Sequence, residues 1–141
     1  MLTALPGSLL RGADKLNTVT FGSNQLTSLP EDLFLGTPKL RFADFRDNFI
    51  SGVSVNLFNN TQQLQFLSFS RNKLATLPLN LLKSTSTLQS FYADGNLLFN
   101  LTDAFFLPVK TSLQTLALFS NNLSHIPVSL DDMSALVDLF V

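Results

Sequence analysis

Apolar residues are spaced along this chain in a way that fits neither one long helix nor one long strand. In the segment 16–29 they stand at Leu16, Val19, Phe21, Leu26 and Leu29. A helix would sustain steps of three and four residues, and a strand would sustain steps of two. Only the residues around Val19 alternate, with Thr18 and Thr20 facing away from the core, which predicts a short strand. The chain must therefore turn back on itself within this segment.

The same pattern recurs along the whole chain and is marked by an asparagine eight residues after the leading apolar residue. These asparagines are Asn24, Asn48, Asn72, Asn96 and Asn121. A fixed period of 23 to 25 residues predicts a solenoid in which each block forms one coil and the short strands form a parallel sheet. We divide the single domain 1–141 into a partial repeat at 1–15, full repeats at 16–39, 40–63, 64–87, 88–112 and 113–135, and the start of a further repeat at 136–141.

The blocks share the pattern LxxLxLxxNxLxxLP, followed by a looser apolar pair. In this they resemble the leucine-rich repeat family over essentially the full chain, and the 24-residue period resembles the typical subclass of extracellular receptors. The resemblance implies an α/β-type repeat, a curved horseshoe solenoid with a parallel β-sheet on the concave face and irregular or short-helical convex segments. It also implies a phenylalanine spine at Leu10, Phe34, Phe58, Leu82 and Phe106. The fifth block has Asp131 at this position, so we expect Met133 or Leu130 to turn inward.

The repeated asparagine follows the strand, where backbone groups at the bend would otherwise be buried without partners. Its amide both donates and accepts, so it can bond the backbone of its own coil and of the adjacent one. We therefore expect an asparagine ladder. Prolines lead the chain away from the bend at Pro6, Pro30, Pro78 and Pro127. Ser54 and Thr102 stand in place of the proline, and we expect looser convex connections there.

Composition narrows the range of partners. The formal net charge of −1 removes the electrostatic basis for binding nucleic acid or an anionic membrane surface. No apolar run approaches the roughly 18 residues of a membrane span, so we expect no direct membrane insertion by this segment. The chain has no cysteine. In secreted relatives the disulfides lie mainly in the caps, so this absence leaves the redox compartment open.

Both ends fall within a repeat. Leu2, Leu5 and Pro6 have the phases of a second half-repeat, and the closing residues stop in the strand of a sixth. A solenoid normally has polar caps over its core, so we expect an internal fragment of a longer array, with self-association through the uncapped ends. Met1 is followed by no basic region or cleavage site, so no signal peptide is recognised in this chain.

Residues that could carry catalysis are few. His125 is the only histidine, and no cluster of acidic residues at ligand spacing accompanies it. The carboxylate pairs at 31–32 and 131–132 are interpreted as turn-capping and solubilising residues of convex loops. We therefore expect no enzyme activity, and no catalytic, cofactor or metal site.

Aromatic and charged residues gather at the positions that face out from the sheet. The candidate partner-binding residues are Phe42, Asp44, Arg46, Phe66, Arg71, Tyr92, Asp94 and Phe119. Cross-strand salt bridges on a solvated face would explain the charges. A docking surface also explains why Phe42 and Phe66 share one phase in neighbouring coils, where they form an apolar strip.

We therefore predict a protein-protein interaction module, a ligand-binding segment of a receptor or adhesion protein that takes a protein or peptide on its concave sheet. Three N-glycosylation sequons, at Asn59, Asn100 and Asn122, lie outside the inward-facing positions and suit an extracellular or cell-surface protein. Their number is close to chance. The alternatives are a cytoplasmic scaffold or regulatory region attached to a signalling enzyme, and a structural spacer array.

Overall fold

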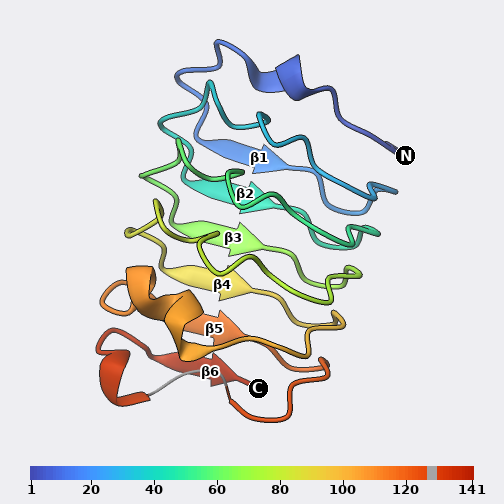
Figure 1. The fold of residues 1–141 in the computed structure, drawn as a ribbon. Helices are drawn as coiled ribbons and strands as arrows, with labels where there is room; N and C mark the ends of the chain where they lie inside the picture. Colours follow the sequence, from blue (N-terminus) through green and yellow to red (C-terminus); the bar gives the residue numbers. More distant parts are fainter. Residues whose placement is uncertain (127–129) are drawn as a thin grey trace.

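The computed structural model describes residues 1–126 and 130–141, and these form a stack of coils that each contribute one short strand (Figure 1). The strands are β1 (Thr18–Thr20), β2 (Phe42–Asp44), β3 (Phe66–Ser68), β4 (Ser90–Tyr92), β5 (Thr115–Ala117) and β6 (Asp138–Phe140). They pair in parallel in the order β1-β2-β3-β4-β5-β6. The expected solenoid with a parallel sheet is confirmed.

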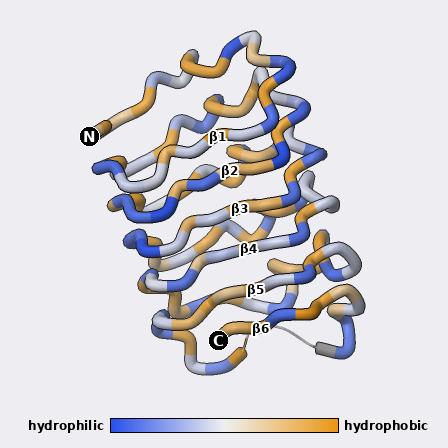
Figure 2. Tube along the Cα trace, turned by 180° about the vertical axis from the view of Figure 1, so that it is seen from behind, coloured by the Kyte–Doolittle hydropathy of each residue, from blue (hydrophilic) through white to orange (hydrophobic). Residues whose placement is uncertain are grey.

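The register places equivalent residues of successive coils side by side. The central strand residues Val19, Ala43, Leu67, Phe91, Leu116 and Leu139 are aligned with one another. They face the core, and their neighbours on either side face outward, as the period of two requires. Hydrophobic and hydrophilic segments accordingly recur in step from coil to coil (Figure 2).

Three short 3-10 helices lie outside the strands in the described part of the chain, one before β1 and the other two between strands. They are η1 (Gly7–Leu10), η2 (Asp103–Val109) and η3 (Leu130–Asp132). The expected irregular or short-helical connections are therefore confirmed.

A column of buried side chains packs against the inner side of the sheet. Its members Phe34, Phe58, Leu82 and Phe106 are at most 1% exposed. The Phe34 ring stacks on Phe58 at 5.5 Å and meets the Phe45 ring edge-on at 6.0 Å between centroids, which joins the spine to the strand side of the core. Leu10 is only partly buried against this core.

The last coil fills its spine differently. Met133 is buried, as one of the two expected substitutes for Asp131, which is exposed. The side chain of Leu130 and the expected Pro127 lie outside the described residues.

The connections that lack proline make other local contacts. Thr102 precedes η2, where Phe105, Phe106 and Val109 are buried. This helix takes up the extra residue of the 25-residue block. The Ser54 hydroxyl donates to Glu31 Oε2 of the preceding coil at 2.8 Å. A side-chain hydrogen bond at Ser54 and a short helix after Thr102 thus stand where the other coils have proline.

Buried threonines form a second polar ladder, which the repeat pattern did not predict. Thr37, Thr61 and Thr85 are fully buried, and each hydroxyl donates to the carbonyl three residues earlier at 3.0 to 3.1 Å. Their backbone carbonyls accept from the leading leucines Leu40, Leu64 and Leu88. The hydroxyl therefore closes the turn that returns the chain to the sheet.

The asparagine ladder has the expected form. In the central coil, Asn72 Nδ2 donates to the Phe69 carbonyl of its own coil and to the Phe45 carbonyl of the preceding coil, both at 3.0 Å. Asn72 Oδ1 accepts from the backbone N–H of Ile50 at 3.0 Å. Asn48, Asn96 and Asn121 repeat this set of bonds.

Replacing Asn72 by Ala should lower the free energy of unfolding by about 1–3 kcal/mol, because buried backbone groups of two coils lose their partners. Replacing Asn80, which is exposed and has no ladder position, should have little effect. Thermal and urea unfolding measure both variants. Equal losses in the two would contradict a structural role for the ladder.

Candidate functional site

The outward-facing residues of the strands form two rows across the sheet. We call these two rows, together with the two residues that precede each ladder asparagine, the concave face. The first row is Thr18, Phe42, Phe66, Ser90, Thr115 and Asp138. The second row is Thr20, Asp44, Ser68, Tyr92, Ala117 and Phe140. Because the strands are in register, residues of equivalent position lie side by side along each row.

Three rings form an aromatic strip across coils two to four. Phe42 and Phe66 stack nearly parallel, with centroids 4.1 Å apart and planes at 7°. Phe66 and Tyr92 lie 5.3 Å apart at 37°. Each ring covers part of its neighbour, so all three are partly buried and present one side to the concave face.

Asp44 differs from the expected solvated position, because it is fully buried. Its Oδ1 accepts from the backbone N–H of Arg46 at 3.0 Å, and its Oδ2 lies 2.9 Å from Arg46 Nε. The Nε–H is not directed at Oδ2, which has no hydrogen-bond partner among the described residues, so this contact is an ion pair. Asp44 therefore holds Arg46 in place and is itself covered.

Asp47 and Arg71 form the second ion pair, between adjacent coils. Arg71 donates through Nε to Asp47 Oδ1 at 2.6 Å and through Nη2 to Asp47 Oδ2 at 2.8 Å. These bonds hold the pKa of Asp47 below its usual value, with a smaller contribution from the charge of Arg46, while partial burial acts in the opposite direction. The pKa of Arg71 is raised, chiefly by the bond to Asp47 and less by the charges of Asp47, Asp94 and Asp44.

The backbone at the bend fixes where these two side chains point. The residue before each ladder asparagine has a positive φ, and only Gly95 is a glycine. Asp47 and Arg71 adopt φ of 56° and 54°, a left-handed conformation that costs an L-residue roughly 1–2 kcal/mol. Both therefore sit at equivalent points of adjacent coils, which brings the guanidinium opposite the carboxylate.

Asp94 lies two residues before the ladder asparagine Asn96, at the bend of the fourth coil, and is only 6% exposed. Its Oδ1 accepts a hydrogen bond of 2.6 Å from Ser70 Oγ of the preceding coil. Ser70 Oγ in turn accepts from Ser68 Oγ at 3.2 Å. In the described part of the chain, neither of the two ion pairs includes Asp94.

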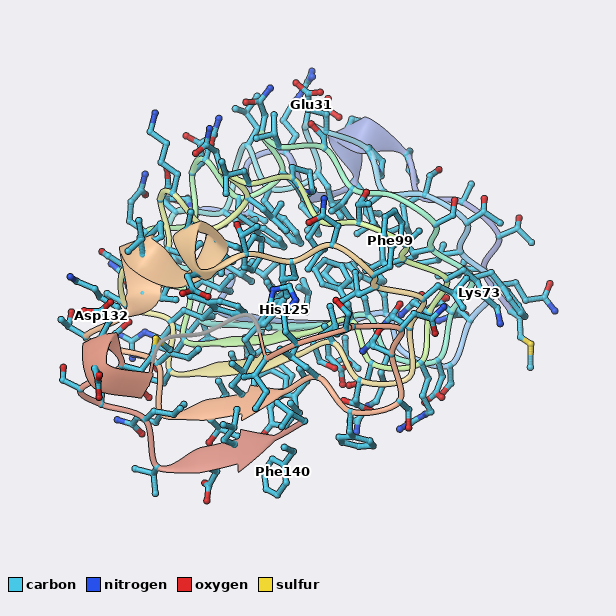
Figure 3. All side chains as sticks on the ribbon, turned by 60° about the horizontal axis from the view of Figure 1, so that its bottom comes forward. Glu31, Lys73, Phe99, His125, Asp132 and Phe140 are labelled. Atoms are coloured by element: carbon cyan, nitrogen blue, oxygen red, sulfur yellow. The ribbon has the colours of Figure 1, made fainter. Side chains whose placement is uncertain are left out.

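A depression of about 580 Å³ lies on the concave face over coils two to six. It is lined by Arg46, Phe66, Ser68, Ser70, Arg71, Tyr92, Asp94, Ala117, Phe119 and Phe140. Figure 3 shows Phe140 beyond β6, on the side of the sheet away from Phe99 and Glu31. Phe119 and Phe140 are 46% and 50% exposed. The depression therefore has aromatic walls and charged groups that are already held in place.

The structure brings most of the candidate residues together. Phe42 and Asp44 do not line the depression; they support the Phe66 ring and the Arg46 guanidinium that do. The sequence pattern predicts that Phe140 is an outward-facing aromatic residue of the second row, although it was not among the candidates. Ser70 carried no signal, because its contribution depends on the carboxylate of the next coil.

A metal site and a membrane-spanning helix each have requirements that the described residues do not meet. No group of three or more histidine, cysteine or acidic side chains there could hold a metal ion. No helix of the described part is long and apolar enough to cross a membrane. His125 is exposed, with its Nδ1 at 3.2 Å from Ser124 Oγ.

Replacing Arg71 by Ala should raise the pKa of Asp47 toward its ordinary value, because the two hydrogen bonds are lost. Replacing Arg46 should raise it less. The stabilisation from the pair is present above the ordinary aspartate pKa and is lost as the pH falls through the lowered value. Carboxyl carbon NMR titration measures the shift. An unchanged Asp47 titration in the Arg71 variant would contradict the ion pair.

No protein-family model matches this sequence, and no curated protein does. Solved structures do resemble the chain. The leucine-rich repeat domain of APL1B has a TM-score of 0.81 and 22% identity over 87% of this chain and 36% of its own. The LRIM1/APL1C complex has a TM-score of 0.84 and 24% identity, and the match covers 97% of this chain and 26% of its own. The APL1 leucine-rich repeat domain has a TM-score of 0.79 and 24% identity, and the match covers 85% of this chain and 31% of its own.

This chain therefore spans between about a quarter and a third of the length of those three structures. The likeness extends along nearly all of this chain, and the blocks that it covers carry the repeated asparagine and the strand leucines. Taken together, the sequence repeat, the one strand per coil and the matching structures establish that the chain has the leucine-rich repeat fold.

Proposed function

We propose that this chain is a protein-protein interaction module that binds a protein or peptide in the depression of its concave face. The observation that carries the proposal is the depression itself, in which four aromatic rings from different coils surround charged groups. Aromatic and arginine side chains in a concave, partly desolvated setting are the residues that supply most of the energy in protein interfaces.

The ordering of the charged groups supports this function. Arg46 is held by Asp44, and Arg71 is held by Asp47 through two hydrogen bonds. Side chains that are already fixed lose less conformational entropy when a partner binds. A spacer array would need neither the fixed guanidinium groups nor the half-exposed rings of Phe119 and Phe140.

We further propose that the parent protein is a receptor or adhesion protein at the cell surface or outside the cell. The support for this location is the resemblance of the repeats to those of extracellular receptors. Binding of a protein partner is supported by one structural neighbour, which is described as a complex of LRIM1 with APL1C. The cytoplasmic scaffold is the alternative. Self-association through the edge strands β1 and β6 is a second mode of partner binding that we propose, because each has an edge without a neighbour in the described chain.

Replacing Phe119 by Ala should weaken partner binding by about 1–3 kcal/mol and leave the melting temperature nearly unchanged, because the half-exposed ring contributes little to the core. The matched control is Phe99→Ala, which removes a ring of similar exposure (56% against 46%) that does not line the depression.

The partner is obtained by selecting a random-peptide display library on the wild-type protein, and the Kd of enriched peptides is measured for each variant. Similar affinities for the wild type, Phe119→Ala and Tyr92→Ala would show that the peptides bind elsewhere. That result would support the hypothesis that the chain is a structural spacer array.

Secretion of the chain from eukaryotic cells should add glycans, because Asn59, Asn100 and Asn122 are all exposed. We expect higher occupancy at Asn100 than at Asn59. The Asn59 amide donates to Asn56 Oδ1 at 3.0 Å, and the sequon hydroxyl of Thr61 is buried, whereas Thr102 is exposed. Glycopeptide mass spectrometry measures each site. No modification at any of them would favour the cytoplasmic alternative.

A further inference from the structure

The depression contains a buried carboxylate, that of Asp94, which is in neither of the ion pairs of the described residues. Asp94 is more than nine-tenths buried and lines the depression. Arg46 is paired with Asp44 and Arg71 with Asp47, so the concave-face positions of coils two to four carry three carboxylates and two guanidinium groups. A buried carboxylate that has one hydrogen bond from a neutral hydroxyl and no ion pair keeps much of its desolvation cost, so this arrangement favours binding of a positive group at Asp94.

The walls around Asp94 suit a cation on an apolar stem. Phe66 and Tyr92 form part of the aromatic strip, and Phe119 and Phe140 line the same depression. Ring faces attract ammonium and guanidinium groups, and they also pack against methylene chains. A long basic side chain from a partner would satisfy both the carboxylate and the rings.

The carboxylate geometry distinguishes between the two basic side chains. Asp94 Oδ1 already accepts the Ser70 hydroxyl at 2.6 Å, and no described residue donates to Oδ2. An arginine fork gains most when it binds both oxygens of one carboxylate, whereas a lysine ammonium binds as a point charge. One open oxygen therefore favours lysine.

We infer that the concave face recognises a lysine side chain of its protein or peptide partner, with Asp94 Oδ2 as the acceptor of the ammonium group and the Phe66 and Tyr92 rings against the stem. This inference rests on the proposed function and specifies the chemistry of its ligand. Asp44 and Asp47 do not compete for the ammonium group, because their own guanidinium partners neutralise them.

The test uses N-acetyl-lysine methylamide as the probe, with the norleucine analogue as its neutral counterpart and the arginine and glutamate analogues as competitors. Each is titrated into the folded chain while backbone amide NMR shifts of Ser70, Tyr92 and Gly95 are followed. We expect saturable shifts with the lysine analogue and at least about tenfold weaker binding of norleucine. Equal binding of norleucine, or stronger binding of the glutamate analogue, would overturn the inference.

Asp94→Asn should weaken lysine binding by about tenfold or more, because the charged acceptor is lost while the amide can still accept from Ser70. The matched control is Asp103→Asn, at an exposed carboxylate at the start of η2, which should not alter binding. Unchanged lysine binding in folded Asp94→Asn would contradict the assignment of the acceptor.

A second variant remains informative if Asp94→Asn does not fold. Ser70→Ala releases Asp94 Oδ1, so the arginine analogue should gain affinity relative to lysine by several fold. A ratio of arginine to lysine affinity that stays the same in the wild type and in Ser70→Ala would overturn the assignment of lysine.

The outcomes separate this inference from the proposed function. Selected peptides that depend on Phe119 and do not contain a required lysine would overturn the inference and leave the proposed function standing. Lysine binding at Asp94 together with peptide capture that does not depend on Phe119 would support the cation site and contradict the proposed peptide-binding face.

Discussion

The structure depends above all on how the backbone is hydrogen-bonded at the bend after each strand. The chain leaves the sheet there through a residue with positive φ, and the groups of that bend point into the stack where water does not reach them. Asn48, Asn72 and Asn96 satisfy these groups in two coils at once, because one amide both donates to carbonyls and accepts from an N–H. Each coil is thus incomplete without its neighbour, so the interactions that stabilise one coil also fix the spacing and register of the next.

The candidate site follows from that register. Side chains at equivalent positions are stacked at the strand spacing, so two phenylalanines one period apart become a stacked pair, and an aspartate and an arginine one period apart become an ion pair. Placing the ion pair at this bend costs conformational energy, since Asp47 and Arg71 occupy a left-handed conformation that the equivalent Gly95 adopts freely. The same conformation occurs at Ser23 and Ser120, so it belongs to the bend of every coil. In coils two and three the residues at this bend position carry the charges of the Asp47–Arg71 ion pair.

The sequence was sufficient to predict the coil, the sheet and the asparagine ladder, because each follows from a residue type repeated at one phase. It was insufficient where a position depends on its particular neighbours. The outward phase of Asp44 was readable, but its burial depends on the pairing with Arg46. The threonine ladder was also periodic, yet Thr61 reads as a surface residue unless its bond to the Phe58 carbonyl is known. The role of Ser70 appears only when the carboxylate of the next coil is placed beside it.

The close stacking of Phe42 on Phe66 also limits how a ligand can lie on this face. Successive coils are separated by about 4.8 Å, whereas same-side residues of an extended peptide are separated by about 6.6 Å. A peptide aligned with the stack therefore falls out of step by roughly 3–4 Å across three coils. It can match one or two coils and must miss the next. Recognition on such a surface is local, so an array can gain or lose coils elsewhere while the site keeps its specificity.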